Sequence, residues 1–202
     1  MRMVKVEETN PQEVAEVLKE GKIIIYPTET VYGLGGDATK EEVVKRIFKI
    51  KKRGRKPISV AFSSLKMVEE YVEVDEVARK IAEEFLPGPL TLILPKKFEF
   101  PSQLTCGLPK VGVRIPDHDF ILEVIEKFGK PITSTSANIS GEKNPMTVEE
   151  AIVQIGREVD LILDGGKCKY GIPSTIVEIE EGKVRILREG PIKREEIEKV
   201  VG

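Results

Sequence analysis

The chain has 202 residues, of which 40% are hydrophobic and 33% are charged. This balance is typical of a globular protein, and the length predicts one domain over residues 1–202 that buries about 70% of the surface of the unfolded chain. The formal net charge of -2 argues against a protein built around nucleic-acid binding, because such proteins usually carry a strong excess of basic residues.

The N-terminal segment already carries charges at Arg2, Lys5, Glu7 and Glu8, which predicts that the chain has no signal peptide. No apolar run approaches the roughly 18 residues of a membrane span, so we expect no membrane association. The two cysteines, Cys106 and Cys168, are far apart and lack C-x-x-C spacing. Their placement favours a reduced, cytoplasmic setting and argues against a zinc site.

Helix N-termini are predicted along the whole chain. Asn10 precedes a proline and has Glu13 at capping-box spacing, and Thr39 and Thr147 are each followed by Glu three residues later. The apolar residues at helical spacing are Val43, Val44, Ile47 and Phe48 after Thr39; Ala78, Ile81, Ala82 and Phe85 after Asp75; and Ile121, Leu122, Ile125 and Phe128 after Asp117, with Gly129 as a C-cap.

Strands are predicted between these helices. The two last strands are separated by Glu180-Glu-Gly-Lys183, which predicts a hairpin. We therefore expect an α/β fold with a twisted mixed sheet, parallel and antiparallel, flanked by helices. The predicted strands are 22–26, 58–62, 90–94, 112–115, 131–133, 161–163, 175–179 and 184–187.

The segment Tyr26–Gly35 (YPTETVYGLG) follows the apolar run Ile23–Ile25. It gathers hydroxyls, a carboxylate and glycines, and we interpret it as a turn between a buried strand and a helix. Such a loop suits a small-molecule site, because backbone N–H groups can approach a ligand closely there. It matches neither the Rossmann nor the P-loop motif, and a purely structural connection is the alternative.

The basic stretch Lys45–Lys56 contains no acidic residue. Three interpretations are open: a solvated helix face, a site for the phosphates of a nucleotide, or a patch for an RNA backbone. Its basic residues are Lys45, Arg46, Lys49, Lys51, Lys52, Arg53, Arg55 and Lys56.

Two further segments place polar groups beside predicted strands. Arg114 interrupts an apolar strand, and because an unpaired buried charge is costly it predicts either a structural ion pair or a grip on a substrate carboxylate. The run 133–138 (TSTSAN) puts four hydroxyls and an amide after a short strand. No G-x-S-x-G elbow is present and His118 has no evident partner, so we reject a serine hydrolase and expect His118 to cap the following helix.

Taken together, these motifs resemble the YrdC-like family, which comprises the threonylcarbamoyl-AMP synthases of tRNA modification. The resemblance covers roughly residues 10–195. Some relatives carry a further C-terminal domain, which we expect this chain to lack. The blocks that carry the resemblance are YPTETVYGLG (26–35), KKRGRKPIS (51–59), PGPLT (87–91), VRIP (113–116), TSTSAN (133–138), PSTIV (173–177) and LREGP (187–191).

The resemblance implies the YrdC-like open α/β fold and two sets of binding residues. The threonine-binding set is Thr30, Arg114, Ser134 and Ser174. The ATP-binding set is Lys51, Arg53, Lys56, Lys110, Ser136, Asn144 and Arg188. The chain is one residue shorter than the family between Arg53 and Pro57, so which basic side chain faces the phosphates stays open. Ala61 also stands where many relatives have a histidine that contacts the amino acid.

The implied reaction joins L-threonine, bicarbonate or CO2, and ATP into threonylcarbamoyl-AMP, with release of pyrophosphate. It requires Mg²⁺ with ATP but no protein nucleophile and no metal ligands from the protein. A downstream enzyme complex would transfer the group to tRNA, and this chain would bind tRNA at most weakly. Two alternatives remain: an RNA-binding module acting through Lys45–Lys56, and a carbamoyl-transfer domain like those of hydrogenase-maturation proteins, which sit in longer chains with zinc-binding cysteines.

Overall fold

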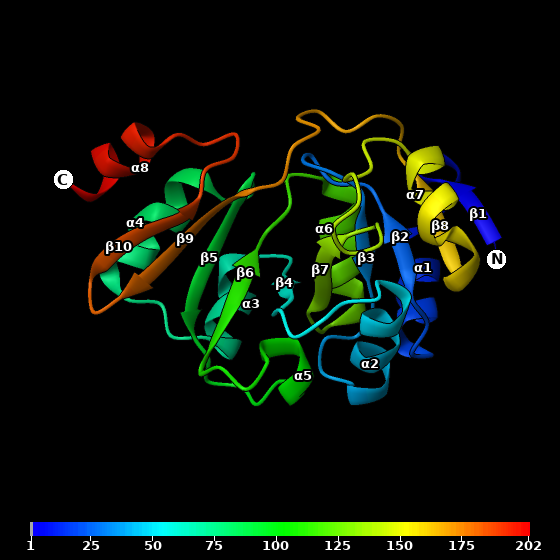
Figure 1. Cartoon of the computed structure of the whole chain (residues 1–202), viewed down its shortest axis with the longest axis horizontal. Coiled ribbons are helices and arrows are strands. Elements are labelled where there is room, and N and C mark those ends of the chain that lie inside the picture. The colour runs from blue at the N-terminus through cyan, green and yellow to red at the C-terminus, as the bar shows by residue number, and fades with distance from the viewer. Residues whose placement is uncertain (1) are drawn as a thin grey trace.

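The computed structural model describes residues 2–202 and is built around one twisted ten-stranded sheet (Figure 1). The strand order is β1-β8-β2-β3-β7-β4-β6-β5-β9-β10. Four neighbouring pairs are parallel and five are antiparallel, so the predicted mixed sheet is confirmed. The strands are β1 (Arg2–Lys5), β2 (Ile24–Tyr26), β3 (Gly33–Gly35), β4 (Ser59–Ala61), β5 (Leu90–Pro95), β6 (Lys110–Arg114), β7 (Ile132–Ser136), β8 (Leu161–Asp164), β9 (Thr175–Glu180) and β10 (Lys183–Arg188).

Helices cover both faces of the sheet but to different extents. One face is covered by α2 and α7 at the N-terminal end of the strand order and by α3, α4 and α8 at the other end (Figure 1). The opposite face is covered by α1 and α6 over only part of its width. The helices are α1 (Pro11–Lys19), α2 (Glu41–Ile50), α3 (Leu65–Tyr71), α4 (Glu76–Phe85), α5 (Ser102–Thr105), α6 (Asp119–Phe128), α7 (Val148–Ile155) and α8 (Arg194–Val201), with 3-10 turns η1 (Val6–Glu8) and η2 (Gly156–Glu158).

The alternation of side chains along a strand separates the two cores. Ile25 of β2 belongs to the large core under α2 and α7, whereas Ile24 belongs to the smaller core under α1 and α6. On β6, Val111 and Val113 point into the large core, which sends Arg114 to the opposite face. Away from α1 and α6 that opposite face has no helical cover among residues 2–202, and the polar positions of its strands gather there.

All eight predicted strands are present, and the predicted hairpin joins β9 to β10 through Glu181 and Gly182. Two strands were missed. Strand β1 is an edge strand that pairs with β8 from Arg2↔Leu161 to Lys5↔Asp164, and because it is largely exposed its sequence carries no apolar alternation.

Strand β3 corrects the interpretation of the 26–35 segment. Its glycines do not form a turn before a helix: they form a strand that pairs with β2 and β7, and α2 begins only at Glu41. The ring of Tyr26 lies across this strand. A Cβ atom on Gly33 would stand 2.6 Å from the Tyr26 ring, and one on Gly35 would stand 2.7 Å from it. Gly33 and Gly35 therefore leave room for the ring of Tyr26.

Two helix caps differ from expectation. Thr39 is not the N-cap of α2, because its hydroxyl donates to Asp37 at 2.6 Å and the cap position falls on Lys40. His118 does occupy the N-cap position of α6, but its side chain makes no capping hydrogen bond. The caps at Asn10, Asp75 and Thr147 form with side-chain hydrogen bonds, and Gly129 ends α6 with a φ of 75°.

Candidate functional site: a cationic cleft

The uncovered part of the sheet face forms a cleft of about 220 Å³, which we call the central cleft. Strands β3, β4, β5, β6, β7 and β9 contribute to its lining, β6 with Arg114 and β7 with three consecutive residues. Loops before β3 and β9, the basic stretch and the end of β10 complete its walls. The lining residues are Thr30, Val31, Gly33, Arg53, Pro57, Ile58, Ser59, Thr91, Arg114, Ser134, Thr135, Ser136, Asn144, Pro173, Ser174, Ile176 and Arg188.

The charge of the central cleft is positive. Arg53, Arg114 and Arg188 line it, and none of the described residues that line it is a carboxylate. Serine and threonine residues from several strands line it together with the three arginines. Guanidinium groups bind carboxylate and phosphate through paired hydrogen bonds, so this lining suits a ligand that carries several negative charges.

Arg114 forms an ion pair with an acidic residue that does not line the central cleft. Its Nη2 donates to Oε1 of Glu29 at 2.6 Å, and the backbone N–H of Asp117 donates to Oε2 of the same carboxylate at 3.2 Å. Glu29 is 5% exposed and Arg114 is 7% exposed. The two interpretations of Arg114 are therefore compatible: it forms a buried ion pair and it also lines the central cleft.

The loop that carries Glu29 is fixed by its own hydroxyl groups. Oγ1 of Thr28 accepts from the N–H groups of Thr30 and Val31, both at 3.2 Å, and donates to the carbonyl of Val31 at 2.7 Å. The backbone N–H groups of Tyr170 and Gly171 donate to the carbonyls of Glu29 and Thr30, each at 2.9 Å. The position of Thr30 in the cleft is thus set by two separate chain segments.

Lys51 forms hydrogen bonds to the end of β7. Its Nζ donates to the carbonyls of Ser136 and Asn138 and, at 3.1 Å, to Oδ1 of Asn138. Oγ of Ser136 donates to that same Oδ1 at 2.6 Å, and the amide of Asn138 contacts Asn144 at 3.4 Å. Burial, followed by the charge of Arg53, lowers the pKa of Lys51 to about 7, while its three oxygen acceptors favour the charged ammonium.

On the opposite wall, the hairpin reaches back to the segment before β9. Nε and Nη2 of Arg188 donate to the carbonyl of Ser174 at 3.0 and 2.7 Å. The hydroxyl of Ser174 lies 2.7 Å from the hydroxyl of Thr91 on β5. These contacts place a guanidinium and two hydroxyls together at the rim of the cleft.

A second, largely apolar cavity of about 540 Å³ adjoins the central cleft, and we call it the side cavity. The two share Pro57, Ile58, Ser59, Thr91 and Ile176. Further lining comes from Ile93, Leu108, Pro109, Lys110, Gly112, Glu178, Glu180 and Leu187.

The structure brings most of the predicted site residues together. All four residues predicted for threonine line the central cleft, as do Arg53, Ser136, Asn144 and Arg188 from the set predicted for ATP. Lys51 lies behind the cleft wall, Lys56 is exposed, and Lys110 lines the side cavity, where its Nζ pairs with Glu178 at 3.1 Å and Glu180 at 2.9 Å.

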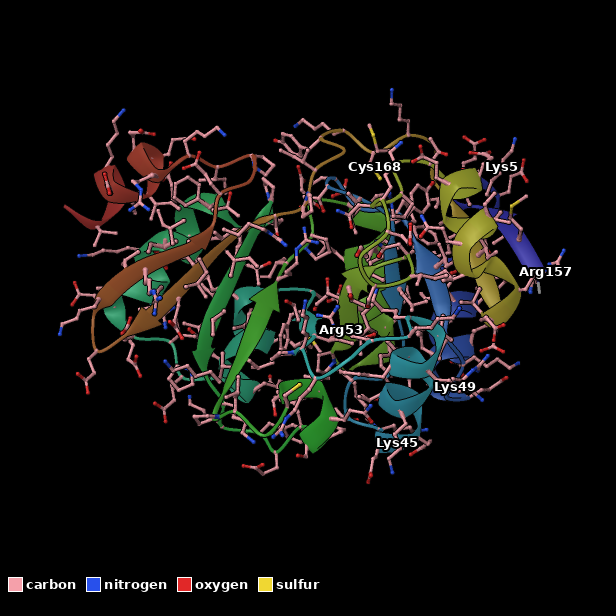
Figure 2. All side chains as sticks on the ribbon, in the orientation of Figure 1. Lys5, Lys45, Lys49, Arg53, Arg157 and Cys168 are labelled. Carbon is pink, nitrogen blue, oxygen red and sulfur yellow. The ribbon has the colours of Figure 1, made fainter. Side chains whose placement is uncertain are left out.

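Within the basic stretch, only Arg53 lines the central cleft among the described residues. Its Nε and Nη2 donate to the carbonyls of Lys56 and Pro57 at 2.8 and 2.7 Å. Figure 2 shows Arg53 in the middle of the molecule, whereas Lys45 and Lys49 project from the outer side of α2. Arg46 pairs with Asp160 at 2.7 Å, so much of the stretch lies away from the cleft.

Sequence reasoning missed Glu29, which stood inside the 26–35 segment without an assigned role. Its partner Arg114 is 85 residues away in the chain, so no local pattern joins the two. Ala61, at the position of the histidine found in many relatives, is buried in the smaller core and pairs in register with Arg114. Both cysteines are free thiols, and burial raises the pKa of Cys168, labelled in Figure 2, to about 11.

Residues 2–202 contain neither a helix that could span a membrane nor a metal-binding cluster of side chains. No helix there combines the length and apolar character needed to cross a membrane. No group of three or more His, Cys, Asp or Glu side chains among these residues could hold a metal ion.

Comparison with known proteins places these features in a family. Residues 16–190 match the model of the Sua5/YciO/YrdC family, whose description reads "Telomere recombination". The threonylcarbamoyl-AMP synthase of Pyrococcus abyssi is 40% identical over 200 residues, which cover 98% of this chain and 59% of that protein. The Bacillus subtilis threonylcarbamoyl-AMP synthase is 36% identical over 200 residues, 96% of this chain and 58% of that protein.

Solved structures agree with the sequence comparison. The structure of P. abyssi Sua5 complexed with L-threonine aligns with a TM-score of 0.93 and 39% identity, and covers 100% of this chain and 60% of that one. Escherichia coli YciO, at 24% identity and a TM-score of 0.85, shares the fold over 97% of this chain and 98% of its own.

The chain thus spans about three fifths of the length of the P. abyssi and B. subtilis relatives. A relative from Methanocaldococcus jannaschii, 41% identical over 199 residues, is matched along 94% of its own length. The family model covers most of the chain and the identities exceed 30% over nearly all of it. The chain therefore belongs to the Sua5/YciO/YrdC family, as its sequence motifs had indicated.

Proposed function

We propose that this protein is an L-threonylcarbamoyladenylate synthase, a nucleotidyltransferase that makes threonylcarbamoyl-AMP and pyrophosphate from L-threonine, bicarbonate or CO2, and ATP. The observation that carries the proposal is the central cleft, in which three guanidinium groups and several hydroxyls face one space. Relatives that share the fold over nearly the whole chain are named for this activity.

The threonine-binding set is Thr30, Arg114, Ser134 and Ser174, all of which line the central cleft. Arg114 binds the carboxylate of threonine with the N–H groups that Glu29 leaves free. The hydroxyls accept from or donate to the amine and hydroxyl of the substrate. The related P. abyssi protein, whose structure carries L-threonine, supports an amino-acid site in this fold.

The ATP-binding set occupies the rest of the central cleft and extends into the side cavity. Arg53 and Arg188 bind the phosphates, together with Ser136 and Asn144, and all four residues line the central cleft. The apolar lining of the side cavity suits an adenine base, with Lys110 at its edge. Lys51 supports this site through Ser136 and Asn138, and exposed Lys56 is free to reach phosphate oxygens from outside.

The chemistry then consists mainly of positioning. The amine of threonine attacks the carbon of bicarbonate or CO2 and forms a carbamate, with loss of water when bicarbonate is used. A carbamate oxygen attacks the α-phosphorus of ATP, and the bond to the β-phosphate breaks with release of pyrophosphate. Arg53 and Arg188 stabilise the charge that develops on the phosphate oxygens, and no residue of the chain becomes covalently attached.

Mg²⁺ enters this reaction bound to ATP. The described lining of the central cleft offers hydroxyl and amide oxygens but no carboxylate, which fits an ion held chiefly by phosphate oxygens and water. Bound there, the ion would neutralise part of the triphosphate charge. The product would pass to a downstream enzyme complex that modifies tRNA in the cytoplasm.

The test is pyrophosphate release with each substrate omitted in turn. We expect release to require ATP, L-threonine and bicarbonate together, and mass spectrometry to detect threonylcarbamoyl-AMP. Release that proceeds equally fast without threonine would contradict the proposed function. Arg46, which is paired with Asp160 away from the cleft, provides the matched control: Arg46→Lys should leave the dependence on all three substrates unchanged.

A further inference from the structure

We propose that Glu29 is a positioning residue for recognition of the amino-acid substrate, and that it acts through Arg114. The inference rests on the proposed function, since it concerns the same cleft. Glu29 does not line the central cleft, yet its carboxylate is the partner that fixes the cleft-lining guanidinium.

The geometry divides the N–H groups of Arg114 between protein and substrate. Nη2 donates to Glu29 at 2.6 Å, whereas Nη1 makes no hydrogen bond to any described residue and is not enclosed by protein. Nε is buried without a partner. With Nη2 anchored, the guanidinium plane cannot rotate freely, so the edge that faces the cleft keeps one orientation before the substrate arrives.

Glu29 is itself held from several directions. Its Oε2 accepts from the backbone N–H of Asp117, three residues after Arg114, so one carboxylate binds both the side chain and the following backbone. The backbone carbonyl of Glu29 accepts from Tyr170 at 2.9 Å. The carboxylate therefore ties the end of β6 to the loop that carries Thr30, another residue of the threonine-binding set.

Because both side chains are buried, the arrangement depends on the negative charge of Glu29. Both partners are more than nine-tenths buried, so loss of the carboxylate leaves a guanidinium whose charge has no local partner in the protein. Glutamine keeps the size of the side chain but has only one acceptor oxygen, because its amide nitrogen cannot accept. The hydrogen bonds from Arg114 and from the N–H of Asp117, which go to two different oxygens of Glu29, therefore cannot both be kept. We therefore expect Glu29→Gln to fold and to bind threonine poorly.

The experiment measures binding of L-threonine by calorimetry, together with KM values for threonine and ATP and the melting temperature. Glu29→Gln should weaken threonine binding at least tenfold and raise its KM by a similar factor, with the KM for ATP changed less than twofold. Asp160→Asn is the matched control, because Asp160 also accepts from an arginine, Arg46, and from a backbone N–H, that of Ile23. It should lower the melting temperature without changing threonine affinity.

A double-mutant cycle separates positioning from simple stabilisation. If Glu29 acts through Arg114, the variant that combines Glu29→Gln with Arg114→Lys should bind threonine no more weakly than Arg114→Lys alone. Additive losses would overturn the proposal, as would a Glu29→Gln variant that melts earlier but binds threonine within twofold of wild type. If the wild type binds threonine but forms no threonylcarbamoyl-AMP, the proposed function fails while the role of Glu29 can still be read from binding.

Discussion

Arg114 forms a buried ion pair at a position that also lines the central cleft. An arginine inside an apolar strand predicts either a structural ion pair or a substrate contact, and the structure shows the ion pair at a position that also lines the cleft. A buried charge that contacts a ligand also needs a partner when the ligand is absent. The pair with Glu29 meets that need.

Substitution of Arg114 should separate its charge from its planar shape. Lysine keeps the charge but cannot make two parallel hydrogen bonds, so Arg114→Lys should lose threonine affinity and keep ATP affinity. Arg114→Ala should weaken threonine binding roughly 30-fold or more, in line with about 2–5 kcal/mol for loss of one partner of a desolvated pair. Calorimetry below the melting temperature of each variant measures both affinities, and normal threonine binding by either variant would contradict the assignment.

His118 should make stability depend on pH. Burial lowers its pKa below the ordinary value of 6.5, although the carboxylates of Glu29, Asp119 and Asp117 act in the opposite direction. The unfolded chain then binds a proton more readily than the folded one, so the free energy of unfolding falls as the pH drops through about 6.5. The chain has one histidine, and the part of the slope that disappears when it is replaced is the contribution of His118.

The check is the melting temperature of wild type and His118→Asn from pH 7.5 to pH 5. Asparagine is a favourable N-cap and does not titrate, so the variant should show a flatter curve over this range with no loss at pH 7.5. Parallel curves for the two proteins would show that His118 is not responsible.

At the residue scale, the motifs predicted which residues lie at or near the cleft better than they predicted which way each side chain points. Ser136 and Ser174 were assigned through the resemblance to the YrdC-like family, because a run of hydroxyl residues by itself is more often a loop or a cap. Lys51 was assigned in the same way from the basic block 51–59, but its side chain turns into the protein and supports β7 instead of lining the cleft. Sequence spacing does not tell which way a side chain leaves the end of a helix.

At the element scale, the contrast between α2 and β3 shows where periodicity is informative. Four apolar residues at helical spacing predicted α2 correctly, because its buried side consists of its own side chains. Strand β3 is a Gly-Leu-Gly segment whose buried surface is supplied by Tyr26 of the neighbouring strand. A strand whose packing surface is supplied by a neighbour has little signal of its own.

Gly35→Ala tests this packing. The new Cβ would stand 2.7 Å from the Tyr26 ring and 3.2 Å from Ile132, so we expect the free energy of unfolding to fall by about 1–3 kcal/mol. Gly54→Ala is the control, because a Cβ there meets nothing within 4 Å. Urea denaturation measures both, and equal stability of the two variants would show that β3 has room for a side chain.

At the scale of the whole molecule, the weak overall charge predicts weak binding to RNA. The net charge is -2, and within the basic stretch Lys45 and Arg46 are paired with Glu41 and Asp160. Bare tRNA should therefore bind with a dissociation constant no tighter than about 1 μM at physiological salt, and more weakly as salt rises. Filter binding at several salt concentrations measures this, and nanomolar, salt-independent binding would favour an RNA-binding module.

The residues that line the cleft could largely be predicted from the sequence, but the strand order that brings them together could not. The intermixed strand and helix patterns indicated a mixed sheet, but they did not determine the order in which the strands pair. Strand β7 lies between β3 and β4, and β9 lies beside β5, so distant segments become neighbours. The hydroxyls of Thr91 and Ser174 lie 2.7 Å apart although the residues are separated by 83 positions in the chain, a contact that depends on the order of the strands.

The grip of Arg188 on the carbonyl of Ser174 has a consequence for biosynthesis. The cleft takes its first lining residue from the loop before β3 and its last from the end of β10. A ribosome must therefore have delivered residues 30 to 188 before all the residues that line the cleft are present. Nascent chains halted before the final hairpin lack Arg188 and its hydrogen bonds to Ser174, so the full cleft lining can assemble only after β10 has left the exit tunnel.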